Sequence, residues 1–81
     1  MQKYRTDAKQ NEAYVVAGQK LRAIREKKGM TQEDLAFEAK MDQSKLSMIE
    51  RLGPQHLSFS KLNDVAEALD CVVVIDFQSK G

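Results

Sequence analysis

The stretch TQEDLAFEAKMDQSKLSMIERL, residues 31–52, contains two helix start signals separated by a short break. Thr31 is a good N-cap residue with Asp34 three positions later, and the two can form a capping box. Asp42 is a second good N-cap, and hydrophobic residues stand at the staple positions around both caps. The stretch therefore predicts two short helices, over about residues 32–39 and 43–52.

Periodicity extends this pattern to both sides. Apolar positions recur at intervals of three and four over about residues 11–28, and Gly29 follows as a terminating glycine would. The Gly-Pro pair at 53–54 ends the second short helix, because proline cannot continue a helix. Ser58 or Ser60 can then cap a last helix, which has an apolar stripe. The sequence thus predicts four helices.

Length and charge bound the interpretation. A chain of 81 residues with 42% hydrophobic residues is enough for one small domain around a single core. The net charge of +1 says nothing by itself about an anionic partner. Residues 1–28, however, carry eight basic and three acidic side chains, whereas residues 29–51 and 52–81 each carry an excess of two acidic ones. We therefore expect the positive electrostatic field around the N-terminal third of the chain.

Composition also argues against several classes of protein. The single cysteine cannot form a disulfide within the chain, no apolar run is long enough for a membrane span, and MQKYRTDAKQ lacks the apolar core of a signal peptide. We therefore expect a cytoplasmic protein. His56 and Cys71 are the only residues of their types, too few for a metal cluster or a Cys-His catalytic pair. We expect no enzyme activity and no catalytic, metal or cofactor site.

The helix over residues 43–52 has an unusual outer face. A helical wheel places Leu46, Ile49 and the edge of Glu50 toward the core. The opposite face suits a DNA major groove, because small hydroxyls can approach either base edge, methionine can contact a thymine methyl, and arginine can reach guanine or phosphate. Gln43 is the best candidate for reading a base, since a glutamine amide can pair with adenine. The alternative is an ordinary polar surface. The outward residues are Ser44, Ser47, Met48 and Arg51.

At this point a resemblance is plain. The segment GQKLRAIREKKGMTQEDLAFEAKMDQSKLSMIE, residues 18–50, resembles the DNA-binding domain of the lambda-repressor/Cro-like (XRE) helix-turn-helix family. The K-G-hydrophobic-T-Q-x-x-L-A entry, the spacing to the following helix and the I-E that ends at Glu50 carry the likeness, which extends over about residues 17–69. The resemblance implies a mainly α fold of four to five helices and double-stranded DNA as the partner.

The resemblance also implies roles for individual residues. Gln32 matches a residue that holds a phosphate, and Gln43, Ser44, Lys45 and Met48 fall on positions that face bases or nearby backbone. Arg51, Gln55 and His56 are further candidates for phosphate contacts. Arg25 and Glu50 match a partly buried ion pair between two helices. The expected DNA-binding set is Gln32, Gln43, Ser44, Lys45, Ser47, Met48, Arg51 and Gln55.

The turn between the two short helices departs from the family pattern. The family usually has glycine where this chain has Lys40, and a left-handed conformation costs a non-glycine residue roughly 1–2 kcal/mol. The turn is therefore expected to differ slightly here.

The last segment changes period. CVVVIDF, residues 71–77, is β-branched and aromatic and predicts one strand within residues 71–78. A lone strand needs a partner, and the same strand of a second copy would give an antiparallel pair across a two-fold axis. Pairing with residues 3–5 is the alternative. The expected dimerisation residues are Val72, Val73, Val74, Ile75 and Phe77.

These expectations combine into one organisation. Residues 1–10 are expected to be a loose segment, residues 11–70 the helix-turn-helix domain, and residues 71–78 the dimerisation strand. The function predicted is a dimeric, sequence-specific repressor of a palindromic operator, bacterial or phage in origin and bound to the nucleoid when active. The plan is also similar to helix-turn-helix antitoxins of the HigA and HipB kind and to prophage-type repressors. The alternative function is therefore an antitoxin that binds a toxin protein and autoregulates its operon.

Overall fold

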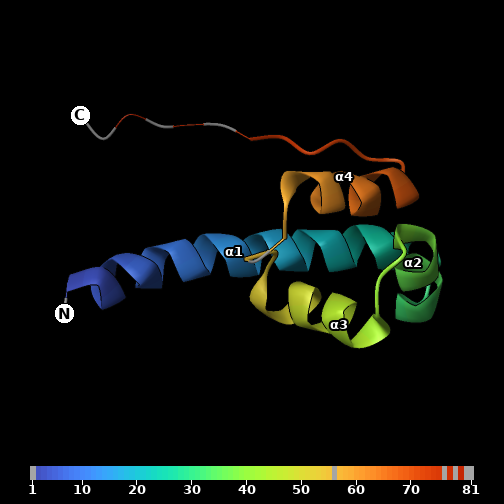
Figure 1. Ribbon diagram of the computed structural model, residues 1–81, viewed down its shortest axis with the longest axis horizontal. Coiled ribbons are helices and arrows are strands. Elements are labelled where there is room, and N and C mark those ends of the chain that lie inside the picture. The colour runs from blue at the N-terminus through green and yellow to red at the C-terminus, as the bar shows by residue number, and fades with distance from the viewer. Residues whose placement is uncertain (1, 56, 76, 78, 80–81) are drawn as a thin grey trace.

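The computed structural model describes residues 2–55, 57–75, 77 and 79, and this part of the chain contains four helices and no strand. In Figure 1, α3 and α4 lie on opposite sides of the long α1, and α2 closes the end of the bundle. None of these helices is long and apolar enough to cross a membrane. The helices are α1 (Gln2–Lys27), α2 (Gln32–Ala39), α3 (Gln43–Leu52) and α4 (Phe59–Ala68).

The predicted starts of α2, α3 and α4 are observed, with one difference in capping. Thr31 and Asp34 form the capping box, with the Asp34 N–H donating to Thr31 Oγ1 over 3.0 Å and the Thr31 N–H donating to Asp34 Oδ2 over 2.9 Å. The bond from the Thr31 backbone N–H lowers the pKa of the Asp34 carboxyl. Ser58 caps α4 through its hydroxyl. Asp42 occupies the N-cap position of α3, but its side chain makes no capping hydrogen bond.

The turn between α2 and α3 is left-handed at Lys40, with φ 57° and ψ 51°. Lys40 therefore adopts a backbone conformation that glycine takes without steric cost. The Lys61 ammonium, on α4, lies 3.4 Å from the carbonyl oxygens of both Ala39 and Lys40. A cation at the C-terminal end of a helix stabilises its free carbonyls, so Lys61 supports the turn from outside.

The core lies where α2, α3 and α4 meet. Leu35, Leu46, Val65 and Leu69 are the largest fully buried side chains. The C-terminal half of α1 adds only partly buried residues to this cluster, Leu21 and Ile24 among them. The apolar face of α1 is therefore not fully covered, and a groove of about 320 Å³ remains between α1, α4 and the C-terminal segment.

Two glycines permit close approach of α1 to its neighbours. A Cβ at Gly18 would overlap the carbonyl oxygen of Ile49, so the backbones of α1 and α3 are in direct contact there. Gly53 follows α3 with φ 93°, and a Cβ there would overlap the carbonyl of Tyr14. Both positions exclude a side chain, and Gly53 also excludes one by its conformation.

Both ends of the chain differ from expectation. The structure places residues 2–10 in α1, where a loose segment was expected; QKYRTDAKQ contains neither proline nor glycine and has nothing that stops a helix. Residues 3–5 are therefore helical and do not pair with a strand. Residues 71–75 form no strand, since the described part of the chain contains no second strand to complete a ladder. Residues 76 and 78, within the expected strand, and His56 lie outside the described residues.

The left-handed turn leads to a stability prediction. Lys40→Gly should raise the free energy of unfolding by about 0.5–1 kcal/mol, because it removes the left-handed strain but gives the unfolded chain more freedom. Thermal unfolding followed by circular dichroism should show a midpoint higher by roughly 2–8 °C. Lys40→Ala keeps the left-handed strain, so it serves as the control and should not raise the free energy of unfolding. A lower midpoint for Lys40→Gly would mean that the lysine side chain itself stabilises the turn.

Candidate nucleic-acid interface

The outer face of α3 is the largest group of candidate residues that the structure brings together. Leu46, Ile49 and Glu50 are buried, as the helical wheel predicted, and hold α3 on the rest of the domain. Met48, on the other side, is 50% exposed. Ser47 is half-buried at the edge of this face. The exposed residues of α3 that were predicted to meet DNA are Gln43, Ser44, Lys45, Met48 and Arg51.

A buried ion pair fixes α3 to α1. Arg25 Nε donates to Glu50 Oε2 over 2.6 Å and Arg25 Nη2 donates to Glu50 Oε1 over 3.0 Å, while the side chains are only 9% and 1% exposed. This is the two-pronged geometry in which arginine binds carboxylates most strongly. The hydrogen bonds that Arg25 donates to Glu50 raise the pKa of Arg25 above its usual value. The ion pair between helices, implied by the resemblance, is present.

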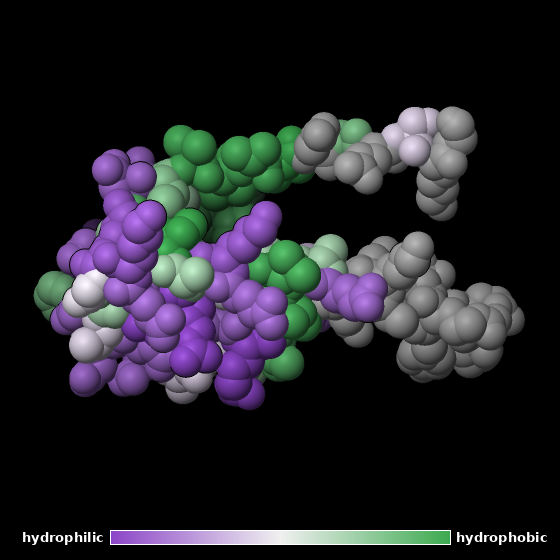
Figure 2. Space-filling model, turned by 180° about the vertical axis from the view of Figure 1, so that it is seen from behind, coloured by the Kyte–Doolittle hydropathy of each residue, from purple (hydrophilic) through white to green (hydrophobic). Residues whose placement is uncertain are grey.

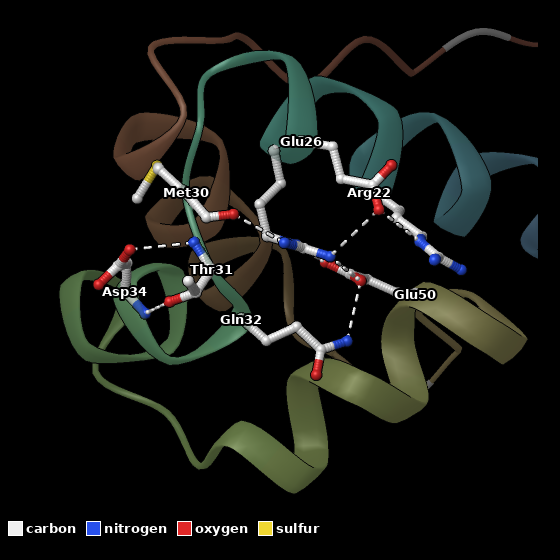
Figure 3. Close-up of polar contacts among 8 residues, drawn as sticks. Arg22, Glu26, Met30, Thr31, Gln32, Asp34 and Glu50 are labelled. Carbon is white, nitrogen blue, oxygen red and sulfur yellow. Dashed lines mark hydrogen bonds and ion pairs between the residues drawn. The ribbon is translucent and has the colours of Figure 1, made fainter.

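The same arginine reaches a third part of the chain. Its Nη1 donates to the carbonyl oxygen of Met30 over 2.7 Å, at the loop that leads into α2. The dashed lines in Figure 3 connect Met30, Glu50 and Gln32 through these contacts. All polar side-chain atoms buried in the described part of the chain have a hydrogen-bond partner. The pair therefore links α1, the start of α2 and α3 with no unsatisfied group left behind.

Gln32 does not point freely into solvent. It is half-buried at the first position of α2, and its Nε2 donates to Glu50 Oε1 over 3.0 Å. The predicted phosphate contact thus starts from a side chain that the ion pair already holds. Sequence reasoning missed this bond, since no local pattern indicates that residues 32 and 50 meet.

The loop after α3 places one more candidate on the surface. Gln55 is exposed, and its Nε2 donates to the carbonyl oxygen of Leu52 over 2.9 Å. Beside it lies an apolar hollow of about 290 Å³, whose lining includes Met48, Leu52 and Leu57. The sequence did not indicate this hollow, because its residues come from both sides of the Gly-Pro loop. It gives Met48 an apolar surrounding at the edge of the α3 face.

Comparison with known proteins agrees with this geometry. The family model described as helix-turn-helix matches residues 21–72. Among solved structures, the restriction-modification controller protein C.AhdI from Aeromonas hydrophila is similar, with 38% identity, 75% of this chain and 91% of that chain covered, and a TM-score of 0.69. The wild-type restriction-modification controller protein C.Esp1396I is similar with 32% identity, 73% and 75% covered, and a TM-score of 0.65. A search of curated proteins found no match.

The ion pair can be tested by removing one partner or both. Arg25→Met should lower the free energy of unfolding by about 3–5 kcal/mol, because it leaves the Glu50 charge buried without a partner. Arg25→Met/Glu50→Leu replaces both charges with apolar groups and should recover most of that loss. Urea unfolding of the three proteins measures both effects. If the double variant were as unstable as the single one, the packing of these side chains rather than their charge would be decisive.

Proposed function

This chain belongs to the XRE-type helix-turn-helix family of DNA-binding transcriptional regulators, and we propose that it binds a palindromic operator as a dimer and represses transcription there. The observation that carries the proposal is the division of α3 into two faces. Its inner face is buried through Leu46, Ile49 and Glu50, whereas Gln43, Ser44, Lys45, Met48 and Arg51 on its outer face are exposed. Such a helix can enter a major groove without rearrangement of the core.

The outer face has the chemistry that base reading needs. Gln43 is exposed at the first turn of α3, where its amide can pair with adenine N6 and N7. Ser44 and Ser47 offer hydroxyls to base edges, and Met48 offers apolar contact to a thymine methyl. Lys45 and Arg51 supply positive charge toward the DNA backbone. Gln32 and Gln55 would hold phosphates on either side of α3.

The dimer part of the proposal rests on the C-terminal segment. Val72 and Val74 are 84% and 81% exposed, whereas the alternate residues Cys71 and Val73 are half-buried against the groove on α1 and α4. The alternation covers residues 71–74, since Ile75 is 60% exposed. Figure 2 shows this segment as a hydrophobic band along the upper edge of the molecule. This alternation of exposed and half-buried residues is typical of a strand that packs one face against the domain.

A second copy of the chain would supply the strand partner that residues 71–75 lack. Antiparallel pairing of two such segments would complete both backbone ladders and cover the exposed valines. A two-fold axis through that pair would present two copies of α3, and a palindromic operator needs them about 34 Å apart. The residues proposed for this contact are Val72, Val73, Val74, Ile75 and Phe77.

Two narrower roles can be separated by gene neighbourhood. The likeness to two restriction-modification controller proteins favours control of restriction-modification genes. The alternative is an antitoxin whose main partner is a toxin and whose DNA binding autoregulates an operon. Adjacent methyltransferase and endonuclease genes would support the first role, and a small toxin-like reading frame would support the second. If neither kind of gene is adjacent, general repression remains the proposal.

Selection of bound duplexes from a random library tests DNA recognition. We expect an enriched inverted repeat, bound with an affinity that falls steeply as salt rises. Gln43→Ala should weaken that site by about 1–3 kcal/mol and leave non-specific DNA nearly unaffected. Ser60 is exposed on α4, and α4 lies across α1 from α3. Ser60→Ala should therefore leave the affinity unchanged and serves as the control. Equal losses for Gln43→Ala on specific and non-specific DNA would remove Gln43 from base reading.

Sedimentation equilibrium tests the dimer. Val74→Asp should raise the dimer dissociation constant at least about tenfold, because pairing would bury an unpartnered carboxylate. Phe37→Asp, which changes an equally exposed side chain on α2, should leave the dimer intact. A Val74→Asp protein that stays dimeric at the wild-type concentration would rule out pairing through the C-terminal segment.

A further inference from the structure

The amide of Gln32 is only partly used in the free protein. A glutamine amide nitrogen carries two N–H groups, and the bond from Gln32 Nε2 to Glu50 Oε1 uses one of them. Gln32 is half-buried, so the side chain is neither extended into solvent nor enclosed. The second N–H is left for an acceptor outside the domain.

Several contacts hold Glu50, the anchor for that amide, in place. Its carboxylate is held on both oxygens by the Arg25 guanidinium, and its side chain is 1% exposed. Arg25 in turn is fixed by the carbonyl of Met30. Because Arg25 neutralises the carboxylate, Glu50 can hold Gln32 without carrying an uncompensated negative charge toward a nearby phosphate.

We infer that Glu50 is a positioning residue for DNA binding: it holds the Gln32 amide so that the second N–H meets a backbone phosphate when α3 enters the groove. The inference rests on the proposed function and adds to it. The Arg25–Glu50 pair then has two roles, one in fixing α3 to α1 and one in preparing a phosphate contact on α2. The resemblance to the helix-turn-helix family implied only the first of these roles.

Two physical arguments favour the second role. Glu50 already accepts two hydrogen bonds from Arg25, so the bond from Gln32 is not needed to keep the buried carboxylate satisfied. In addition, ordering a long polar side chain on binding weakens affinity by about two- to tenfold, and an amide that is ordered beforehand avoids this loss. The contact therefore contributes to binding more than to folding.

A double-mutant cycle on the full chain tests the inference. Gln32→Ala is made in the wild-type protein and in Arg25→Met/Glu50→Leu, which has the same net charge, and affinities are measured on the selected operator. In the wild-type background we expect Gln32→Ala to weaken binding about tenfold, the loss of a hydrogen bond to a charged group. In the pair-replaced background the same change should cost less than about threefold.

A matched control separates positioning from a general shift of α3. Gln43→Ala removes an equivalent amide from α3 itself, and it should cost the same factor in both backgrounds. If Gln32→Ala costs equal factors in both backgrounds, or nothing in the wild type, the positioning role is overturned while DNA binding stands. If the wild-type protein enriches no DNA at all, the proposed function fails, and that outcome is visible before any variant is made.

A measurement on the unaltered protein covers the case in which the double variant does not fold. Side-chain ¹⁵N relaxation of the free wild-type protein should show the Gln32 amide nearly as rigid as the backbone, in contrast to the exposed Gln19 on α1. The Gln32 amide should keep that rigidity in the DNA complex. An amide as mobile as that of Gln19 in the free protein would overturn the inference.

Discussion

The buried pair of Arg25 and Glu50 is the interaction on which the rest of the domain depends. The core proper joins α2, α3 and α4, and α1 contributes only partly buried side chains to it. Polar contacts also fix α1: one guanidinium binds Glu50 on α3 and the Met30 carbonyl before α2. Buried charges require such geometric completeness, because a single missing partner leaves a large desolvation cost. The orientation of α3 is therefore set by direction-dependent bonds rather than by apolar contact alone.

Backbone conformation adds a second constraint. The contact between α1 and α3 requires Gly18, and the exit from α3 requires Gly53. The α2–α3 turn requires a left-handed residue and has Lys40 there, with the Lys61 ammonium against its carbonyls. The domain thus tolerates backbone strain at a turn, where a side chain can still extend into solvent, but it has no side chain at all where two backbones touch.

The sequence predicted what local signals encode. The caps at Thr31 and Ser58, the stop at Gly53 and the inward turn of Leu46 and Ile49 all follow from residues within a few positions of each other, and all are observed. The start of α1 was predicted at about residue 11 and is wrong, because the polar segment before it has no proline or glycine that would stop a helix. The bond between Gln32 and Glu50 depends on how three helices pack, so no spacing rule could indicate it. The strand could not be settled by pattern, since its formation depends on a partner.

The length of α1 has a consequence for how the molecule behaves in solution. Its 26 residues correspond to about 39 Å of helix, which matches the longest extent of the structure, 40 Å, against 23 and 22 Å in the other directions. Figure 1 shows the first turns of this helix extending beyond the rest of the bundle. The hydrodynamic radius is therefore larger than that of a sphere of equal mass, and elution volume in size-exclusion chromatography overstates the mass of a single copy.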